Sequence, residues 1–551
     1  MTGVARTSAC GLLAVTLHLP GPSTSPGSAQ ERDGVTTFEL TTATVEDINA
    51  AFDAGALTSV RLTELYLARI EAYDARGPRL NAVITVSPDA LRLAAELDEE
   101  RARSGPRSPV HGIPVLVKDN YNTFDMPTTA GSVALEGSIP PGDAFTVRQL
   151  RDAGAIILGK VNMSEFASPA GWGSYSSLNG ITLNPYDLRR TPAGSSGGTG
   201  AAIAAALAAV GLGTDTGGSI RGPAAANGLT GIRATYGLLS RSGIVPQALS
   251  LDVPGPMARS VTDMAVALGI MAGSDTDDPT TLGDGRRSYD DYTQFLDEAA
   301  LRGARIGVAR DFFGGNPEVD ALMEASIRAM REAGATIVDP VRFEAEFLDF
   351  MERNGSGIRS RINAEFQPGL EDYLATLEEG YPRTLAEVIA IYESPQVVHS
   401  ALPVNPGLIA LHKRNLAIGG RNNPDYIRAI QNDLPRVRRT VLEIMERHRL
   451  DALIYPTSRC PAGPIHTVEE DLGRFCEPGP SATNLSSYSG FPDLQVPAGF
   501  TSGGLPATVS FLGRAFSEPE LLGYAFAFEQ ATGHWRLPPL VPPLPGEAFD
   551  Y

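Results

Sequence analysis

Short continuous apolar runs alternate with helical segments along much of this chain, and this alternation constrains its fold most strongly. Residues 113–117 and 155–158 predict buried strands, and residues 144–152 between them predict a helix. Strands that are apolar on both faces require helices on both sides of their sheet. The sequence therefore predicts an α/β layer fold with a covered sheet.

The same patterns predict the other elements. Further strands are expected at 81–86, 305–308, 336–341, 451–455 and 507–511, and further helices at 44–54, from 58–59 onward, and at 88–103, 200–210, 317–333 and 519–532. Residues 345–435 carry more helical signals and are expected to cap the core. The proline-rich tail at 537–546 is expected to lie as an extended strap on the surface.

Composition excludes some classes of function. The chain has 551 residues, of which 42% are hydrophobic and 20% charged, as in a globular protein with a large core. Its 45 basic and 64 acidic residues give a net charge of −19, which argues against a general nucleic-acid-binding surface. No apolar run reaches the length of a membrane span.

The N-terminal segment resembles a secretion leader. Arg6 precedes an apolar stretch at 11–19, and Gly27, Ser28 and Ala29 provide a small-residue cleavage site. We therefore expect residues 1–36 to be a leader and linker, and we favour export to the periplasm or medium over a cytoplasmic location.

The three cysteines leave the redox state open. If a leader is removed, Cys10 is removed with it. Cys460 and Cys476 then either form one disulfide or remain as two free thiols. A zinc site is not expected, because only His466 lies nearby and no paired Cys-x-x-Cys spacing exists. No metal or other cofactor is predicted.

Two glycine-rich turns each present a serine, and one lysine precedes them. The turns read TPAGSSGG at 191–198 and TDTGGSIR at 214–221, and Lys118 closes the apolar run at 113–117. A serine hydroxyl needs a base to become a nucleophile. The seven histidines are scattered and no Gly-x-Ser-x-Gly elbow is present, which disfavours a Ser-His-Asp triad.

A buried lysine can act as that base, because burial disfavours its charged form. Lys118 suits this role, although a structural pairing with Asp119 is the alternative. The run 194–200 is similar to a phosphate loop but lacks the following Gly-Lys-Ser/Thr. Ser219 follows two glycines, where backbone N–H groups can converge on an oxyanion.

The order of these motifs resembles the amidase signature family over residues 40–537. The likeness includes HGIP at 111–114, KDN at 118–120, PTTAGS at 127–132 and LGK at 158–160, with GIRATYG at 231–237 and GPMAR at 255–259 downstream. It implies a single domain over 37–540, with its catalytic core at about 105–270 and the tail end at 541–551. It also implies a large mixed β-sheet of many strands sandwiched between helices.

The resemblance also implies roles for individual residues. Ser219 is the nucleophile, Ser195 is the bridging serine after a cis peptide bond, and Lys118 is the base. The backbone N–H groups of the turn hold the oxyanion, and three further residues support the relay. The oxyanion hole comprises Thr216, Gly217, Gly218 and Ser219, and the supporting residues are Ser196, Asp215 and Arg221.

The segment 170–180 departs from the common family pattern, so Trp172 and Tyr175 are candidates for the substrate pocket, with ordinary packing as the alternative. After residue 280, segments such as RSYDDY at 287–292 and NPDYI at 423–427 are most similar to bacterial peptide amidases. That likeness implies hydrolysis of peptide C-terminal amides or small carboxamides, with release of ammonia or an amine.

Other functions stay open at this point. Aryl amides, carbamates and esters are alternative substrates for the same acyl-enzyme chemistry. A non-catalytic amide-binding or scaffold protein is the alternative from another class. No nucleic-acid partner is expected, and the sequence does not give the oligomeric state.

Overall fold

The structure is a computed structural model that describes residues 36–168, 170, 173–283, 285, 287–352, 357–466 and 476–551. The expected leader at 1–36 therefore lies almost wholly outside the described residues, as does Trp172. Within these ranges, no helix is both long enough and apolar enough to cross a bilayer.

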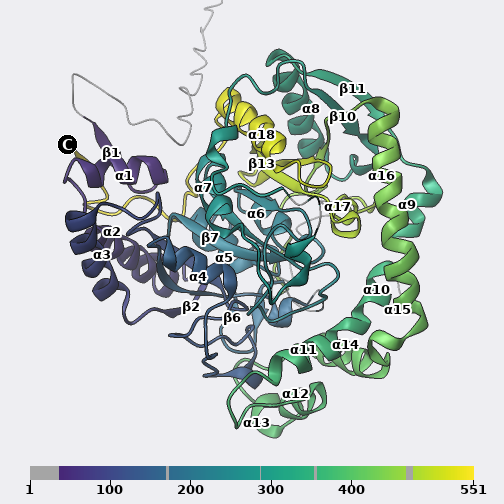
Figure 1. Cartoon of the computed structure of the whole chain (residues 1–551), viewed down its shortest axis with the longest axis horizontal. Helices are drawn as coiled ribbons and strands as arrows, with labels where there is room; N and C mark the ends of the chain where they lie inside the picture. Colours follow the sequence, from purple (N-terminus) through teal and green to yellow (C-terminus); the bar gives the residue numbers. More distant parts are fainter. Residues whose placement is uncertain are drawn as a thin grey trace, which may run out of the picture.

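An 11-stranded mixed sheet forms the centre of the molecule (Figure 1). In spatial order the strands are β11 (Thr336–Val341), β10 (Arg305–Ala309), β12 (Ala452–Pro456), β14 (Pro506–Leu512), β13 (Asp493–Phe500), β8 (Thr230–Arg233), β9 (Val253–Ala258), β7 (Val210–Asp215), β3 (Pro114–Lys118), β4 (Ile156–Val161) and β2 (Val83–Val86). Strand β3 runs parallel to β4 and β7, whereas β9 pairs antiparallel with β7 and β8. Every residue of β3, β4, β7 and β9 is buried, so helices cover both faces, as predicted.

Helices surround this sheet along the whole chain (Figure 1). The first ten are α1 (Val45–Asp53), α2 (Ser59–Arg69), α3 (Ala90–Ser104), α4 (Phe145–Asp152), α5 (Gly197–Ala204), α6 (Arg221–Ala226), α7 (Val261–Met271), α8 (Pro317–Glu332), α9 (Ala345–Glu352) and α10 (Ile358–Ile362). They are followed by α11 (Phe366–Leu374), α12 (Leu385–Tyr392), α13 (Pro395–Val398), α14 (Pro406–Ala417), α15 (Pro424–Arg428), α16 (Leu434–His448), α17 (Thr483–Ser489) and α18 (Glu518–Thr532).

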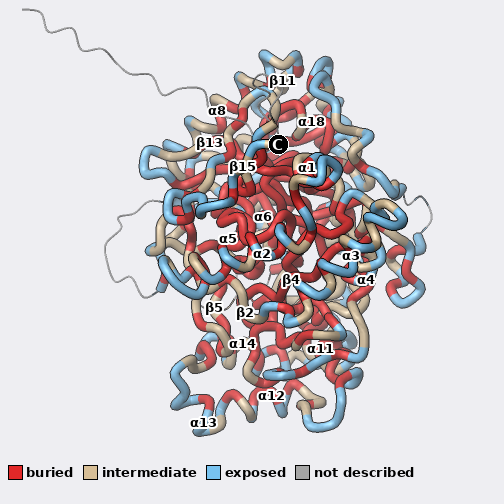
Figure 2. The backbone as a smooth tube through the Cα atoms, turned by 90° about the vertical axis from the view of Figure 1, so that its left-hand side faces the viewer, coloured by how far each residue is buried: buried red, intermediate tan, exposed pale blue. Residues whose placement is uncertain are grey.

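Local sequence signals account for several of these boundaries. Thr44 caps α1 through a capping box with Asp47, and Asn316 caps α8, which begins at a proline. The helix-rich region predicted at 345–435 forms α9 to α15, and α11 to α14 gather at the end of the molecule opposite α18 (Figure 1). Buried residues run through the centre of the molecule, and exposed ones occupy its rim (Figure 2).

One predicted helix is wrong in its second half. The alanine-rich segment 200–210 is helical only through Ala204, and β7 begins at Val210. Two buried arginines donate hydrogen bonds to backbone carbonyls of the segment 205–209, which lies between this helix and β7. Arg69 Nη2 donates to Ala205 O at 2.8 Å, and Arg259 Nη1 donates to Ala208 O at 2.8 Å. These long-range contacts outweigh the helical propensity of alanine.

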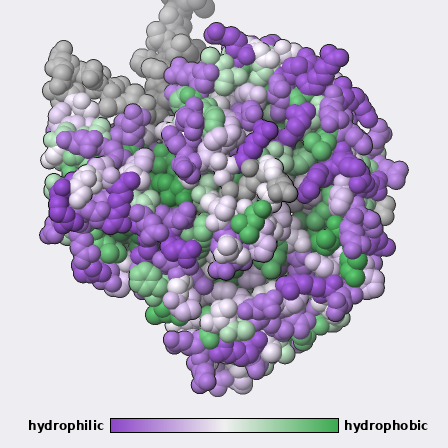
Figure 3. Space-filling view, viewed as in Figure 1, coloured by the Kyte–Doolittle hydropathy of each residue, from purple (hydrophilic) through white to green (hydrophobic). Residues whose placement is uncertain are grey.

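The C-terminal tail does form a strap. Arg69 Nη2 donates to Val541 O at 2.9 Å, and Val541 is fully buried. Beyond it, β15 (Ala548–Asp550) pairs antiparallel with β1 (Thr37–Glu39), so the two ends of the described chain lie side by side. The face seen in Figure 3 is largely hydrophilic, with apolar residues in small separate patches.

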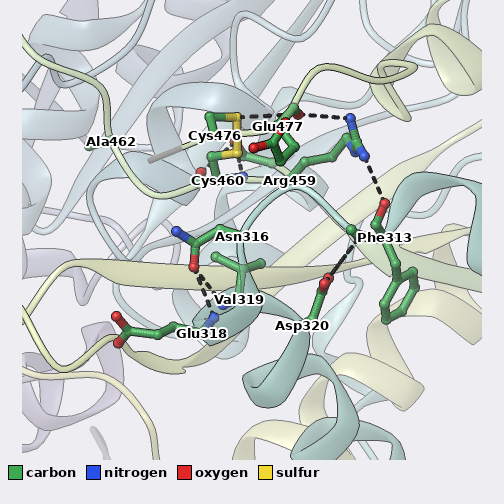
Figure 4. Close-up of a disulfide and its surroundings, with 12 residues drawn as sticks. Phe313, Asn316, Glu318, Val319, Asp320, Arg459, Cys460, Ala462, Cys476 and Glu477 are labelled. Atoms are coloured by element: carbon green, nitrogen blue, oxygen red, sulfur yellow. Dashed lines mark hydrogen bonds between the residues drawn. A yellow bond between two sulfur atoms is a disulfide. The ribbon is translucent and has the colours of Figure 1, made fainter. Parts of the chain in front are cut away.

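Cys460 and Cys476 form a disulfide, with their Cα atoms 5.6 Å apart (Figure 4). The neighbouring Arg459 holds the same region, because its Nη2 donates to Phe313 O at 2.8 Å and its Nη1 donates to Glu477 O at 3.2 Å. Of the two redox states that the sequence left open, the structure contains the oxidised one.

Candidate active site

The carboxyl ends of two neighbouring parallel strands carry the central groups of the site. Strand β3 ends at Lys118, and β7 ends at Asp215 with Thr214 before it. In the register of this pair, Val117 lies beside Leu212, which brings Lys118 next to the end of β7. Ligand sites in sheets of this kind characteristically lie at the carboxyl ends of parallel strands.

Lys118 contacts Ser195 directly. Its Nζ lies 2.7 Å from Ser195 Oγ and 2.7 Å from Thr214 Oγ1, within hydrogen-bond distance of both. Lys118 is fully buried. Burial lowers the pKa of Lys118 from 10.5 to about 7, although the nearby carboxylates of Asp215 and Asp252 oppose this shift. A neutral lysine near pH 7 can accept a proton.

The alternative of a Lys118–Asp119 pair does not occur. Asp119 instead pairs with the equally buried Lys160, whose Nζ lies 3.5 Å from Asp119 Oδ1. Lys118 is therefore left without a carboxylate partner among the ion pairs of the described residues.

The first serine turn lies at the start of α5. The peptide bond between Gly194 and Ser195 is cis. Ser196 bonds to both backbone polar groups of Thr214, because its Oγ donates to Thr214 O at 3.2 Å and Thr214 N donates to the same Oγ at 3.3 Å. The helix approaches the sheet so closely that a Cβ on Gly198 would lie 2.2 Å from Asn162 O.

Thr214 is a residue that the sequence reasoning missed. Its Oγ1 receives hydrogen bonds from both Lys118 Nζ and Asn120 Nδ2, the latter at 3.1 Å. Ser196 thus holds Thr214, which in turn holds Lys118.

Ser219 lies in the turn between β7 and α6 and shares a cavity of about 340 Å³ with Ser195. The backbone joins the two turns directly, since Ser196 N donates to Ser219 O at 3.3 Å. No histidine is found among the described residues that line this cavity. The structure therefore brings Lys118, Ser195 and Ser219 together as one group.

A buried ionic network fixes the second turn. Asp215 accepts hydrogen bonds from Arg221 Nε and Nη2, both at 3.0 Å, and Arg221 Nη1 donates to Asp493 at 2.7 Å. Arg233 also pairs with Asp215, at 3.2 Å. Burial opposes ionisation of Asp215, but the two arginines outweigh it and hold the pKa of that carboxyl well below its usual range.

The predicted oxyanion hole needs one correction. Gly218 N donates to Asp215 Oδ1 at 2.8 Å, so this N–H is already committed to the buried carboxylate. For the N–H groups of Thr216, Gly217 and Ser219, no acceptor occurs within the described part of the chain. Thr216 is held by its side chain instead, which donates to Asp252 Oδ1 at 2.6 Å.

Of the two predicted pocket residues, Tyr175 is not among the described residues that line the cavity. Its hydroxyl donates to Pro403 O at 2.8 Å. Trp172 lies outside the described residues.

Besides Ser164 and Ser168, three polar side chains from the C-terminal half of the chain line the cavity. They are Arg359 at the start of α10, and Asn484 and Tyr488 on α17. Their sequence positions lie far from the serine turns, and no motif marked them.

Comparison with known proteins identifies the family of the chain. The chain matches the Amidase family over residues 61–522. It is 36% identical to a probable amidase of Arabidopsis thaliana, over 92% of this chain and 93% of that protein. It is also 36% identical to a glutamyl-tRNA(Gln) amidotransferase subunit from Myxococcus xanthus, over 91% and 99% of the two chains.

A solved structure extends the likeness to the fold. The native peptide amidase of Stenotrophomonas maltophilia superposes with a TM-score of 0.80 and 41% identity, over 90% of this chain and 98% of that one. These matches confirm the expected family, the large mixed sheet and the enzyme class. The chain therefore belongs to the amidase signature family and is a hydrolase of amide C–N bonds.

Proposed function

We propose that the protein hydrolyses amides through a Ser219–Ser195–Lys118 relay and an acyl-enzyme intermediate. One observation carries this proposal: a fully buried lysine with a pKa of about 7 lies 2.7 Å from a serine that shares a cavity with a second serine. This combination supplies a base, a proton carrier and a nucleophile without histidine.

In the first half of the reaction, Ser219 Oγ attacks the amide carbonyl carbon. Its proton passes to Ser195, whose own proton passes to neutral Lys118. The N–H groups of Thr216, Gly217 and Ser219 stabilise the oxyanion that forms. The C–N bond then breaks, and the proton returns through Ser195 to the departing nitrogen, which leaves as ammonia or an amine.

In the second half, water attacks the ester formed on Ser219. Ser195 and Lys118 again take the proton, and they return it to Ser219 Oγ as the acid is released. The relay ends in its starting protonation state, so Lys118 must be neutral at the beginning of each half.

The substrates that we favour are peptide C-terminal amides and small carboxamides. The 41% identical relative is a peptide amidase, and a second similar structure, also of a peptide amidase and also 41% identical, is a complex with the competitive inhibitor chymostatin. A cavity of about 340 Å³ that is lined by both polar and apolar groups fits a compact substrate. Aryl amides, carbamates and esters are the alternative substrates.

Release of the leaving group from a panel of substrates tests this proposal: ammonia from a primary amide or carbamate, aniline from an anilide, and an alcohol from an ester. The panel comprises a peptide amide, a simple carboxamide, an anilide, a carbamate and an ester, each with wild type and with Ser219→Ala. We expect release of ammonia from the peptide amide and loss of this activity in the variant. Equal rates in the two proteins would remove Ser219 from the mechanism. No turnover of any substrate, together with no covalent labelling by a fluorophosphonate, would favour the non-catalytic alternative.

The location that we propose is outside the cytoplasm. The Cys460–Cys476 disulfide supports this, because such bonds persist in oxidising compartments. The mass and N-terminal sequence of the protein recovered from the periplasm or medium test the location and the cleavage near Ala29. Recovery of uncleaved, reduced protein from the cytoplasm alone would contradict it.

A further inference from the structure

Arg359 places a positive charge in the wall of the catalytic cavity. It lines the same cavity as Ser195 and Ser219. Its Nη1 would lie 3.4 Å from a Cβ placed on Gly217, which belongs to the turn that presents Ser219. A group bound by this guanidinium therefore lies beside the carbonyl that Ser219 attacks.

Within the described residues, no carboxylate forms an ion pair with Arg359, although Asp252, Asp215 and Glu365 lie near enough for their charges to act on it. Arg359 Nε is buried without a hydrogen-bond partner in this part of the chain. Its side chain contacts a neutral group, because Nη2 donates to Gln247 Oε1 at 2.5 Å. The structural arginines of this site behave differently, since Arg221 and Arg233 are both paired with Asp215.

Asp252 contacts both Gln247, which accepts the hydrogen bond from Arg359, and the turn that presents Ser219. Its Oδ2 accepts a hydrogen bond from Gln247 N at 2.8 Å, while its Oδ1 accepts one from Thr216 Oγ1 at 2.6 Å. One carboxylate thus fixes the residue that orients Arg359 and a residue of the oxyanion turn. The guanidinium is held at a set place relative to the reacting carbonyl.

We infer that Arg359 is a specificity-determining residue that binds a second oxygen acceptor of the substrate, next to the scissile amide. A guanidinium has five N–H donors, which carbonyl and carboxylate oxygens can accept, and its fork matches the geometry of a carboxylate. In a peptide amide, the carbonyl of the preceding acyl group is such an acceptor, whereas a simple carboxamide has none. The inference deepens the proposed function and rests on it.

Two matched substrates isolate this contact. Acetylphenylalaninamide carries an acetamido carbonyl near its amide, and 3-phenylpropanamide is the same molecule without the acetamido group. A third substrate, the monoamide of benzylsuccinic acid, carries a free carboxylate instead. The enzymes are wild type, Arg359→Met and Arg359→Lys, with Arg428→Met as a control because Arg428 is an exposed arginine paired with Asp425 on α15.

We expect Arg359→Met to lower kcat/KM for acetylphenylalaninamide by about 10- to 100-fold, the effect of one hydrogen bond to a charged group. The value for 3-phenylpropanamide should change by less than about 3-fold, and Arg428→Met should change neither. A larger loss on the carboxylate substrate, rescued by Arg359→Lys, would identify the acceptor as a carboxylate. An equal fall for all substrates would overturn the inference.

Two controls separate this inference from the proposed function. Wild type and Arg359→Met should react with a small fluorophosphonate at the same rate, which shows that Ser219 is intact. If wild type does not hydrolyse acetylphenylalaninamide, the peptide amide proposal fails. The inference is then tested by the ratio of kcat/KM for the carboxylate substrate to kcat/KM for 3-phenylpropanamide. If this ratio is the same in wild type and in Arg359→Met, the inference is overturned.

Discussion

Lys118 Nζ lies 2.7 Å from Ser195 Oγ, although 77 positions separate the two residues in sequence. The lysine is fully buried, and no carboxylate pairs with it among the described ion pairs. This contact sets the base of the proposed relay, and the predictions below follow from it and from the groups that hold it.

The first prediction concerns the pH dependence of activity. Only neutral Lys118 accepts a proton, and its pKa is about 7. We expect kcat/KM to rise with pH through an apparent pKa near 7. Lys118→Ala should lower kcat/KM by at least about 100-fold, as expected for loss of a general base. A pH-independent rate between pH 6 and 9 would contradict the assignment of Lys118.

The same shift predicts a pH dependence of stability. The folded protein releases the Lys118 proton above a pH of about 7, whereas the unfolded chain keeps it up to about 10.5. The contribution of this group to the free energy of unfolding therefore rises with pH across that window. Compared with wild type, Lys118→Met should gain more stability at pH 6 than at pH 9, as measured by urea unfolding. If the free energies of unfolding of the two proteins differ equally at pH 6 and at pH 9, the pKa of Lys118 is not lowered in the folded protein.

The next prediction concerns the hydroxyl group of Thr214. Thr214→Val removes the hydroxyl that Lys118 and Asn120 contact, at almost unchanged volume. We expect a fall in kcat of about 10- to 100-fold from the loss of one hydrogen bond to the base. Thr230→Val is the matched control, because the buried Thr230 hydroxyl has no partner in the described structure. Similar losses in both variants would indicate a general packing effect.

Asp215 should contribute mainly to stability. Asp215→Asn removes the charge that pairs with Arg221 and Arg233, and breaking a buried pair in this way costs about 3–5 kcal/mol. Asp425→Asn, which breaks an exposed pair with Arg428, should cost no more than about 1 kcal/mol. Urea unfolding of the two variants checks the contrast, and equal costs would refute the structural role of the buried network.

The disulfide should stabilise the protein without serving the chemistry. Cys460 and Cys476 are 16 positions apart, and closing a loop of that length contributes about 3 kcal/mol in the chain-entropy treatment. The double variant Cys460→Ser/Cys476→Ser should lose stability to a similar degree, keep its kcat, and stop responding to reductant. A wild type whose melting temperature is the same with and without dithiothreitol would contradict this.

The sequence predicted the outer strands of the sheet better than its centre. Strands β8, β9 and β13 were not predicted, and β7 was partly assigned to a helix. Strand β9 reads VPGPMA, and its glycine and prolines are residues that normally argue against a strand. Its neighbours β7 and β8 supply the pairing that local propensity does not.

The residues of the candidate site likewise divide into those that the sequence identified and those that only the structure identified. Lys118, Ser195 and Ser219 could be found because they lie in short motifs with a fixed order. Arg359 and Tyr488 could not, because tertiary packing brings each of them to the site. Thr214 lies inside one of these motifs, but only the structure shows that its hydroxyl contacts Lys118. The commitment of Gly218 N to Asp215 likewise depends on how the turn folds back on the end of β7.

The position of a covalent adduct tests the central claim most directly. A fluorophosphonate reacts with an activated serine, and tryptic digestion then yields a peptide, 191–221, that contains both Ser195 and Ser219. Fragment-ion mass spectrometry separates the two positions. We predict a single adduct on Ser219, none in Ser219→Ala, and slow formation in Lys118→Ala. An adduct on Ser195, or undiminished labelling of Ser219→Ala, would contradict the proposed relay.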